Sequence, residues 1–347
     1  MAVFGMAVVG IGRARLAGFA SLAGLAGLAG CGAPPRLPGE AASCAVSAAA
    51  TLTCGASGDS CCTSLSVPRG TYARTYVNDG SGPVGLSDPA SVTGFRLDKY
   101  LVTVGRFRAF VAASVAGWVP PAGAGKHAHL NGGRGLADSG GGGYEAGWDP
   151  ADDIRLATTS ADWTARLQCE PSFQAWTDSI GPNETRPMNC IDWYDAYAFC
   201  IWDGGFLPSE AEWEYAAAGG DEQRAYPWGS TPPAGSSRYL ISGCNYPPDS
   251  SACTGVMNLA PVGTATLGAG RWSQLDLAGN LSEWTLDWYA PYAGPCIDCV
   301  YLTDFSYRVV RGGSFGTDVD DVFPPSRNGD VPSSHNSFYG VRCARAP

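Results

Sequence analysis

The chain has 347 residues, of which 45% are hydrophobic and only 16% are charged, and it contains 47 glycines, 25 prolines and 13 cysteines. This composition is typical of a globular, loop-rich protein with one large domain or two small ones, and it excludes long solvated helices. The formal net charge of −10 excludes attraction of nucleic acid or anionic lipid through a basic surface.

The first 31 residues are predicted to be a lipoprotein signal peptide. Arg13 and Arg15 precede an apolar stretch, Leu16–Ala29, that is too short for a good membrane span. It runs into the motif L-A-G-C, which resembles the bacterial lipobox, so Cys31 is the expected lipidation site. Gly32 follows in place of Asp, which favours the outer membrane of a bacterial cell envelope. An ordinary signal peptide, cleaved at the A-G step, is the alternative.

Residues 32–63 are predicted to be a cysteine-containing tether. The stretch is rich in Ala, Ser, Gly and Thr, has almost no large apolar residues, and therefore cannot build a core by itself. Export to an oxidising compartment leaves twelve cysteines, an even number, for disulfides. The adjacent Cys61 and Cys62 could form a redox or metal site, but Cys44 and Cys54 nearby favour structural pairing, with the partners left open.

A folded domain is predicted over residues 64–347, and it begins with short strands near residues 67–72 and 95–100. The apolar residues of 102–111 recur at helical spacing, and Thr103 can cap that helix.

The Gly-rich stretch 116–147 contains His127 and His129, two residues apart. The two imidazoles could chelate a metal, but no carboxylate or third histidine is near in sequence. A solvated loop is therefore favoured.

Two helices are predicted in the middle of the chain. The first covers residues 190–200, with Asp192 as its N-cap. The second begins after Ser209, which forms an S-x-x-E capping box with Glu212, and a Gly-Gly pair ends it. Capping accounts for Glu210 and Glu212 without an acid–base role.

A tight Gly-Asn turn lies between two acidic residues, Asp276 and Glu283. Two carboxylates with backbone carbonyls between them suit a hard cation, although the spacing is not that of an EF-hand.

The last forty residues are predicted to contain the functional groove. We expect a strand at 308–311, a Gly-Gly turn, an acidic loop, and a second strand at 339–343 that pairs with the first across the loop. No cysteine lies between Cys299 and Cys343.

Taken in order, eight stretches of the chain resemble the formylglycine-generating enzyme family, also called the sulfatase-modifying-factor domains. They are V-P-R-G-T-Y, F-R-L-D-K-Y-L-V-T-V-G-R-F-R-A-F-V, I-D-W-Y-D-A-Y-A-F-C-I-W, L-P-S-E-A-E-W-E-Y-A-A-A-G-G, Y-P-W-G, D-L-A-G-N-L-S-E-W-T-L-D-W-Y, R-V-V-R-G-G-S-F and G-V-R-C-A-R. The resemblance covers about Ser64 to Arg345.

The resemblance implies an α+β fold of the C-type-lectin-like, formylglycine-generating-enzyme type, with little regular secondary structure and disulfide staples. It implies a disulfide between Cys200 and Cys343. It also implies a structural calcium ion whose ligands are Asp276, Glu283 and the carbonyls of Ala278, Gly279 and Leu281. We further predict the disulfides Cys169–Cys190, Cys244–Cys253 and Cys296–Cys299.

The oxidising enzymes of this family hold copper with two cysteines shortly after G-G-S, since Cu(I) requires soft thiolate ligands. Thr317 and Val322 stand near those positions here, so copper is not expected and no catalytic residue is assigned. Phe206 also stands where the family usually has Arg before L-P-S-E-A-E-W, so no charge contact is carried over to that corner.

We therefore expect an exported, lipid-anchored, non-catalytic binding or structural protein of the cell envelope, outside the nucleic-acid-binding classes. Its ligand would be an unknown protein or glycan, held in a groove between the loop after Gly313 and the turn 226–228. The alternative is a formylglycine-generating oxidase acting on a cysteine of an exported sulfatase-type protein. That enzyme would need thiols from elsewhere, and C-x-x-C at Cys296 and Cys299 is the compact candidate. An iron-dependent sulfoxide synthase is disfavoured, because the chain has only three histidines.

Overall fold

The computed structural model describes residues 41–45, 52–250 and 252–347, so the predicted signal peptide and Cys31 lie outside the described residues. The α-helices are α1 (Ala42–Ala45), α2 (Val104–Val115), α3 (Ser160–Arg166), α4 (Trp193–Trp202) and α5 (Glu210–Ala218). Short 3-10 helices are η2 (Asn131–Gly133), η3 (Pro150–Arg155), η4 (Gly220–Glu222), η5 (Val256–Asn258) and η6 (Val319–Asp321). Within the described ranges, no helix is both long and apolar enough to cross a bilayer.

The strands are short and belong to several small sheets. They are β1 (Thr53–Cys54), β2 (Asp59–Ser60), β3 (Ser64–Val67), β4 (Gly70–Val77), β5 (Val84–Val92), β6 (Phe95–Asp98), β7 (Ala137–Asp138), β8 (Ser282–Trp288), β9 (Cys296–Ile297), β10 (Cys299–Val300), β11 (Arg308–Arg311), β12 (Arg327–Asp330), β13 (Tyr339–Gly340) and β14 (Ala344–Arg345). The sheets have the orders β1-β2, β10-β7, β12-β11-β8-β13, β14-β6-β3 and β4-β5-β9.

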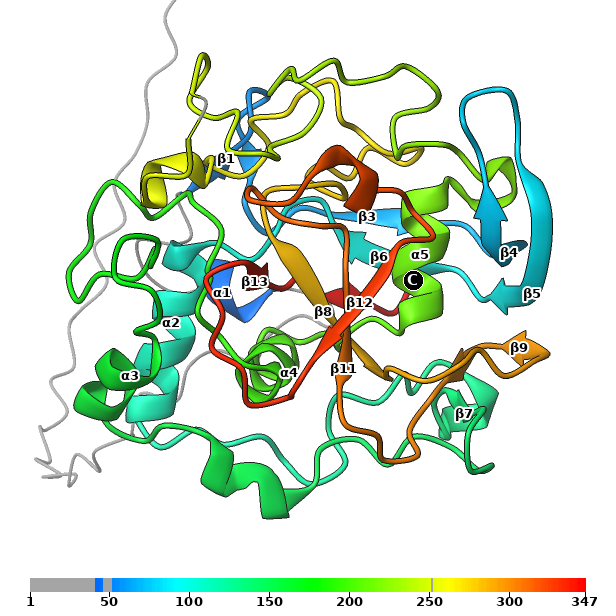
Figure 1. The fold of residues 1–347 in the computed structure, drawn as a ribbon. Helices are drawn as coiled ribbons and strands as arrows, with labels where there is room; N and C mark the ends of the chain where they lie inside the picture. Colours follow the sequence, from blue (N-terminus) through cyan, green and yellow to red (C-terminus); the bar gives the residue numbers. More distant parts are fainter. Residues whose placement is uncertain (1–40, 46–51, 251) are drawn as a thin grey trace, which may run out of the picture. The chain divides into compact units, whose positions relative to one another are not determined.

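The four-stranded sheet positions the predicted groove, and Figure 1 shows β8, β11 and β12 side by side. The expected pairing of residues 308–311 with 339–343 is wrong, because β8 lies between these two segments. In β8, Glu283 faces Arg311 of the antiparallel β11 on one side and Gly340 of the parallel β13 on the other. The last strand is also shorter than expected, since the chain leaves this sheet after Gly340 and pairs β14 with β6.

The predicted helices α2, α4 and α5 are confirmed, together with their caps. Thr103 accepts the amide of Arg106, and Asp192 forms a capping box at the start of α4. The side chain of Ser209 accepts the amide of Glu212, whose carboxylate in turn accepts the amide of Ser209. These short polar side chains satisfy amides that a helix start leaves without partners. The sequence did not predict α3 or the long β4–β5 hairpin.

All four predicted disulfides are present: Cys200–Cys343, Cys169–Cys190, Cys244–Cys253 and Cys296–Cys299. The structure also pairs Cys44 with Cys62 and Cys54 with Cys61, so the adjacent cysteines belong to two structural bridges.

The described part of the predicted tether belongs to the folded domain. Cys54 and Cys61 are buried in the main core cluster, and β1 pairs with β2. The carboxylate of Asp59 lies 2.5 Å from the ammonium of Lys99, and the hydroxyl of Tyr100 donates to the carbonyl of Cys54. Two disulfides and these polar contacts hold a stretch that has few apolar side chains of its own.

Candidate ligand-binding site

The Gly-Gly turn after β11 brings together the two positions where the family's copper cysteines were expected. Gly313 has a φ of +68°, a conformation that favours glycine. A Cβ atom at Gly313 would meet the hydroxyl of Thr317 and a methyl group of Val322, each at 2.8 Å. The two side chains lie on either side of η6 in sequence and approach the same point in space. Two thiols at these positions would therefore be close enough to bind one metal ion together.

Neither side chain offers the soft donor that copper requires. The Thr317 hydroxyl accepts the amide of Ser314 at 2.9 Å and donates to the Ser314 carbonyl at 3.0 Å, which closes the turn. Val322 is 1% exposed and packs in a small apolar cluster with Leu240 and Ala278. A satisfied hydroxyl and a buried aliphatic group cannot replace two thiolates.

No thiol is available from the rest of the described chain either. All twelve cysteines in the described ranges form disulfides, including Cys296 and Cys299 of the C-x-x-C segment. Both of these cysteines are buried, at 1% and 5% exposure. In this state of the protein, the segment contributes a local disulfide that joins β9 and β10.

Two hollows flank the turn. The smaller one has a volume of about 110 Å³ and is lined by the Gly-Gly turn, by Val310 of β11, and by polar residues that include Ser282, Thr317, Asp321 and Asn328. The larger one has a volume of about 420 Å³ and lies between β4, the chain at Ala225, Tyr292 and the segment before β12. Arg327 lines both hollows. Neither hollow is lined by the 226–228 turn of the predicted groove, but Tyr226 packs on Phe323, which lines the larger hollow, at 5.3 Å between ring centroids.

The aromatic ring of Tyr292 lines the larger hollow and contacts two guanidinium groups. The guanidinium carbon of Arg74 lies 4.2 Å from the ring centroid of Tyr292, and that of Arg327 lies 4.0 Å from it. Arg327 also binds the carboxylate of Glu210 with two nitrogens, at 2.6 and 2.7 Å. A bidentate pair of this kind fixes the orientation of the guanidinium plane.

A second buried ion pair lies beneath Tyr292. Arg311 contacts Glu214 at 2.9 Å, and both side chains are fully buried. The hydroxyl of Tyr292 donates to Glu214 at 3.1 Å. Burial raises the pKa of Glu214 to about 8, although the charge of Arg311 acts in the opposite direction. Local sequence explains Glu210 and Glu212 by capping and gives no sign of this network, because its members come from α5, β11, β12 and the loop after β8.

The predicted calcium ligands fit a cation only in part. Asp276 is buried, one carboxylate oxygen accepts the amide of Gly263 at 2.7 Å, and the other has no hydrogen-bond partner. An orphaned buried carboxylate oxygen is what a missing hard cation would leave. Glu283, in contrast, accepts two hydrogen bonds from Arg342 at 2.7 and 2.8 Å and one from Trp213 at 2.9 Å. A guanidinium thus already neutralises Glu283, and the two carboxylates do not form one free pair.

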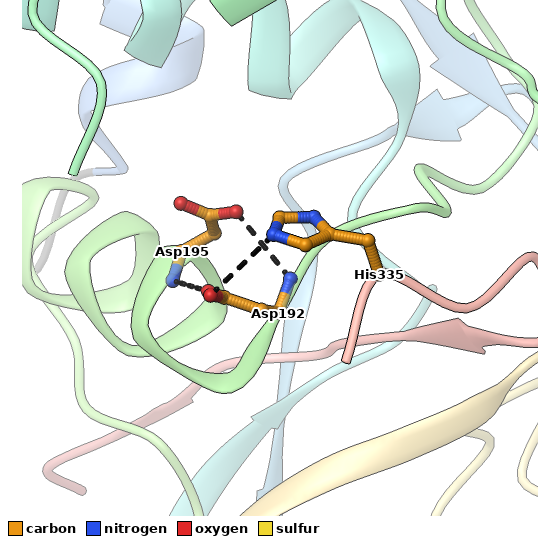
Figure 2. Close-up of side chains that lie close together, drawn as sticks. All are labelled: Asp192, Asp195 and His335. Carbon is orange, nitrogen blue, oxygen red and sulfur yellow. Dashed lines mark hydrogen bonds and ion pairs between the residues drawn. The ribbon is translucent and has the colours of Figure 1, made fainter. Parts of the chain in front are cut away.

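A group of potential metal ligands does occur at the start of α4, where Figure 2 shows Asp192, Asp195 and His335 close together. Arg166 already occupies it: its guanidinium contacts Asp192 at 2.6 Å and Asp195 at 2.8 Å. The two aspartates also form the capping box of the helix. Arg166 therefore neutralises the two aspartates, which also cap the helix. They are not free to bind a metal.

The prediction of a solvated loop at His127 is wrong. His127 is completely buried, and its imidazole lies 3.0 Å from the carboxylates of both Glu145 and Glu212. Burial alone would lower the pKa of His127, but the two carboxylates raise it to about 10. Glu212 lies 85 residues away in sequence, whereas Glu145 belongs to the same Gly-rich stretch and reaches His127 only through the way this loop folds. His129 is half-buried and its ring stacks on Phe206, so Phe206 packs against this loop in place of a charge contact.

Comparisons with known proteins agree with the resemblance. The family model for the "Sulfatase-modifying factor enzyme 1-like domain" matches residues 53–347. A formylglycine-generating enzyme of Streptomyces coelicolor is 32% identical over 288 residues, covering 79% of this chain and 84% of that protein. A mouse protein described as inactive C-alpha-formylglycine-generating enzyme 2 is 33% identical over 185 residues, covering 49% of this chain and 54% of that protein. The chain belongs to the sulfatase-modifying-factor family.

Solved structures that align with this chain include Treponema denticola variable protein 1, with a TM-score of 0.49, 20% identity, and coverage of 82% of this chain and 95% of that one. PvdO from Pseudomonas aeruginosa has a TM-score of 0.48, 19% identity, and coverage of 82% and 94%. The fold class is the predicted one: α+β and C-type-lectin-like, with short strands, few helices and several disulfides. The matched region starts at residue 53, within the segment 32–63 that the sequence predicts to be a tether.

Proposed function

We propose that this protein is an exported, lipid-anchored member of the sulfatase-modifying-factor family that binds a ligand without catalysing cysteine oxidation. The observation that carries the proposal is the pairing of Thr317 and Val322 around Gly313, at the two positions where the family's copper chemistry requires thiols. The engagement of every described cysteine in a disulfide supports it, because no second thiol pair is at hand. The hollows beside this turn supply the binding surface.

A peptide assay tests the absence of catalysis. The purified full-length protein is incubated with Cu(I), oxygen and a sulfatase-type peptide that contains one target cysteine, and the peptide is then weighed by mass spectrometry. We expect no change in peptide mass, while the related Streptomyces coelicolor enzyme, run in parallel, provides the positive control. A mass loss that corresponds to conversion of the thiol to an aldehyde would refute the proposal.

The alternative function is a formylglycine-generating oxidase, and it is favoured by relatives that carry that name at 30 to 32% identity. Such an enzyme would have to obtain its thiols by opening Cys296–Cys299. If aldehyde forms in the assay and Cys296→Ser abolishes it while Cys244→Ser does not, the alternative replaces our proposal.

The proposed location is the outer membrane, with Cys31 as the lipidated residue. The lipobox-like motif and the glycine that follows it support this location. Cells labelled with radioactive palmitate are expected to incorporate label into the wild-type protein and not into Cys31→Ser. Fractionation is expected to find the labelled protein in the outer membrane.

A further inference from the structure

The larger hollow beside Tyr292 has the properties of a small-molecule site. Its volume of about 420 Å³ falls in the range of roughly 300 to 1,000 Å³ that is common for ligand pockets. One wall is apolar and consists of Val77, Ala225, Phe323 and Pro325. Tyr226 packs on Phe323 and also stacks on Trp228, with 4.8 Å between those two ring centroids. These contacts restrict the position of Phe323.

The lining of the hollow also contains a buried cation that no carboxylate of the described chain pairs with. Arg74 is 4% exposed and lines the hollow. Its guanidinium donates to the carbonyls of Asp88 and Ala293 and lies 4.0 Å from the sulfur of Cys299. Among the described residues, no carboxylate forms an ion pair with Arg74. Since a guanidinium has five N–H groups and three are engaged, two remain for a ligand.

The other arginine of the hollow does not add net charge. Arg327 is balanced by its bidentate contact with Glu210. The hollow therefore presents one buried guanidinium without an ion-pair partner beside apolar side chains. Asp79 also lines the hollow, but it is exposed to solvent and forms no ion pair with Arg74. A buried charge without a partner costs folding free energy, and a ligand of opposite charge would recover it.

We propose that this hollow binds a small organic monocarboxylate with an aromatic or aliphatic body. The carboxylate accepts the remaining N–H groups of Arg74, and the body lies against Val77, Phe323 and Pro325. A single negative charge matches the one guanidinium that lacks an ion-pair partner, whereas a phosphate dianion would bring a second negative charge into a hollow that Asp79 also lines. The inference rests on the proposed binding role and names the class of ligand.

Two probes that differ only in charge test the proposal, 4-phenylbutyrate and its neutral amide. Binding to the purified full-length protein is measured by titration calorimetry, with saturation-transfer NMR as a second readout. We expect the carboxylate to bind at least about tenfold more tightly than the amide, as a charge-assisted contact in a partly desolvated site should achieve. Arg74→Met is expected to remove this difference. Equal binding of the two probes by the wild type, or no binding of either, would overturn the proposal.

A pair of surface variants keeps the test decisive if Arg74→Met fails to fold. Val77 and Val84 face each other in the β4–β5 hairpin and are exposed to 67% and 63%, but only Val77 lines the hollow. Val77→Glu places a negative charge in the site and is expected to abolish binding of 4-phenylbutyrate. Val84→Glu makes the same change outside the hollow and is expected to keep the Kd within about threefold of the wild type. Equal effects of the two substitutions would contradict the proposed location. The peptide assay for catalysis does not depend on either variant.

Discussion

Replacing His127 by Gln is expected to destabilise the protein by about 4 kcal/mol. The imidazole is fully buried between Glu145 and Glu212, at 3.0 Å from each. Its pKa of about 10 in the folded protein, against 6.5 in a model peptide, corresponds to about 4 kcal/mol of folding free energy at pH 7. Removing one partner of a buried charge pair costs a similar amount, about 3 to 5 kcal/mol, because the carboxylates are left uncompensated.

The contribution of His127 to folding stability decreases as the pH rises. Because the pKa of His127 is raised in the folded state, its contribution is fully present below pH 6.5 and is lost as the pH rises through 10. Urea unfolding under oxidising conditions, followed by tryptophan fluorescence between pH 6 and 10, measures this contribution. The wild type should lose stability toward pH 10, and His127→Gln should lack that component of the decline.

His129→Gln is the matched control, since His129 lies two residues further along the same loop. Its ring nitrogens have no hydrogen-bond partners, and its ring stacks on Phe206. We expect it to lose about 1 kcal/mol, the worth of an aromatic contact. If His127→Gln costs no more than His129→Gln, the assignment of a buried imidazolium is refuted.

Three further predictions concern the turn after β11, the calcium position and the longest disulfide loop. The double variant Thr317→Cys with Val322→Cys should bind one Cu(I), as measured by chelator competition, while the wild type binds none; equal copper content in both would contradict the convergence of these side chains. Calcium at a hundred times its Kd should stabilise the wild type by about 2.7 kcal/mol and should not change the stability of Asp276→Asn. A melting temperature of the wild type that changes with neither calcium nor chelator would refute the calcium site. Replacing both Cys200 and Cys343 by Ser should cost about 5 kcal/mol in urea unfolding, given the sequence separation of 143 residues. A loss below about 1 kcal/mol would show that the core alone holds these segments together.

The sequence alone determined the features that depend on neighbouring residues and on family motifs. The caps at Thr103, Asp192 and Ser209 were predictable, because a helix start needs a polar side chain within three residues of its first amides. The motif R-G-G-S-F located the two positions without thiols, since Gly313 fixes a turn whose geometry depends on a few adjacent residues. The disulfide Cys200–Cys343 came from the family resemblance rather than from spacing.

Only the tertiary structure decided how distant charges are paired. The sequence predicts a solvated loop at His127, because Glu212 lies far along the chain and the contact with Glu145 depends on how the loop folds. The ion pair between Glu283 and Arg342 likewise has no local signal. The buried guanidinium of Arg74 has no sequence signal either, because its neighbours Tyr292, Ala293 and Cys299 lie more than 200 residues away. Local patterns set caps and turns through short-range contacts, whereas the electrostatics of a buried site depend on which distant segments the fold brings into contact.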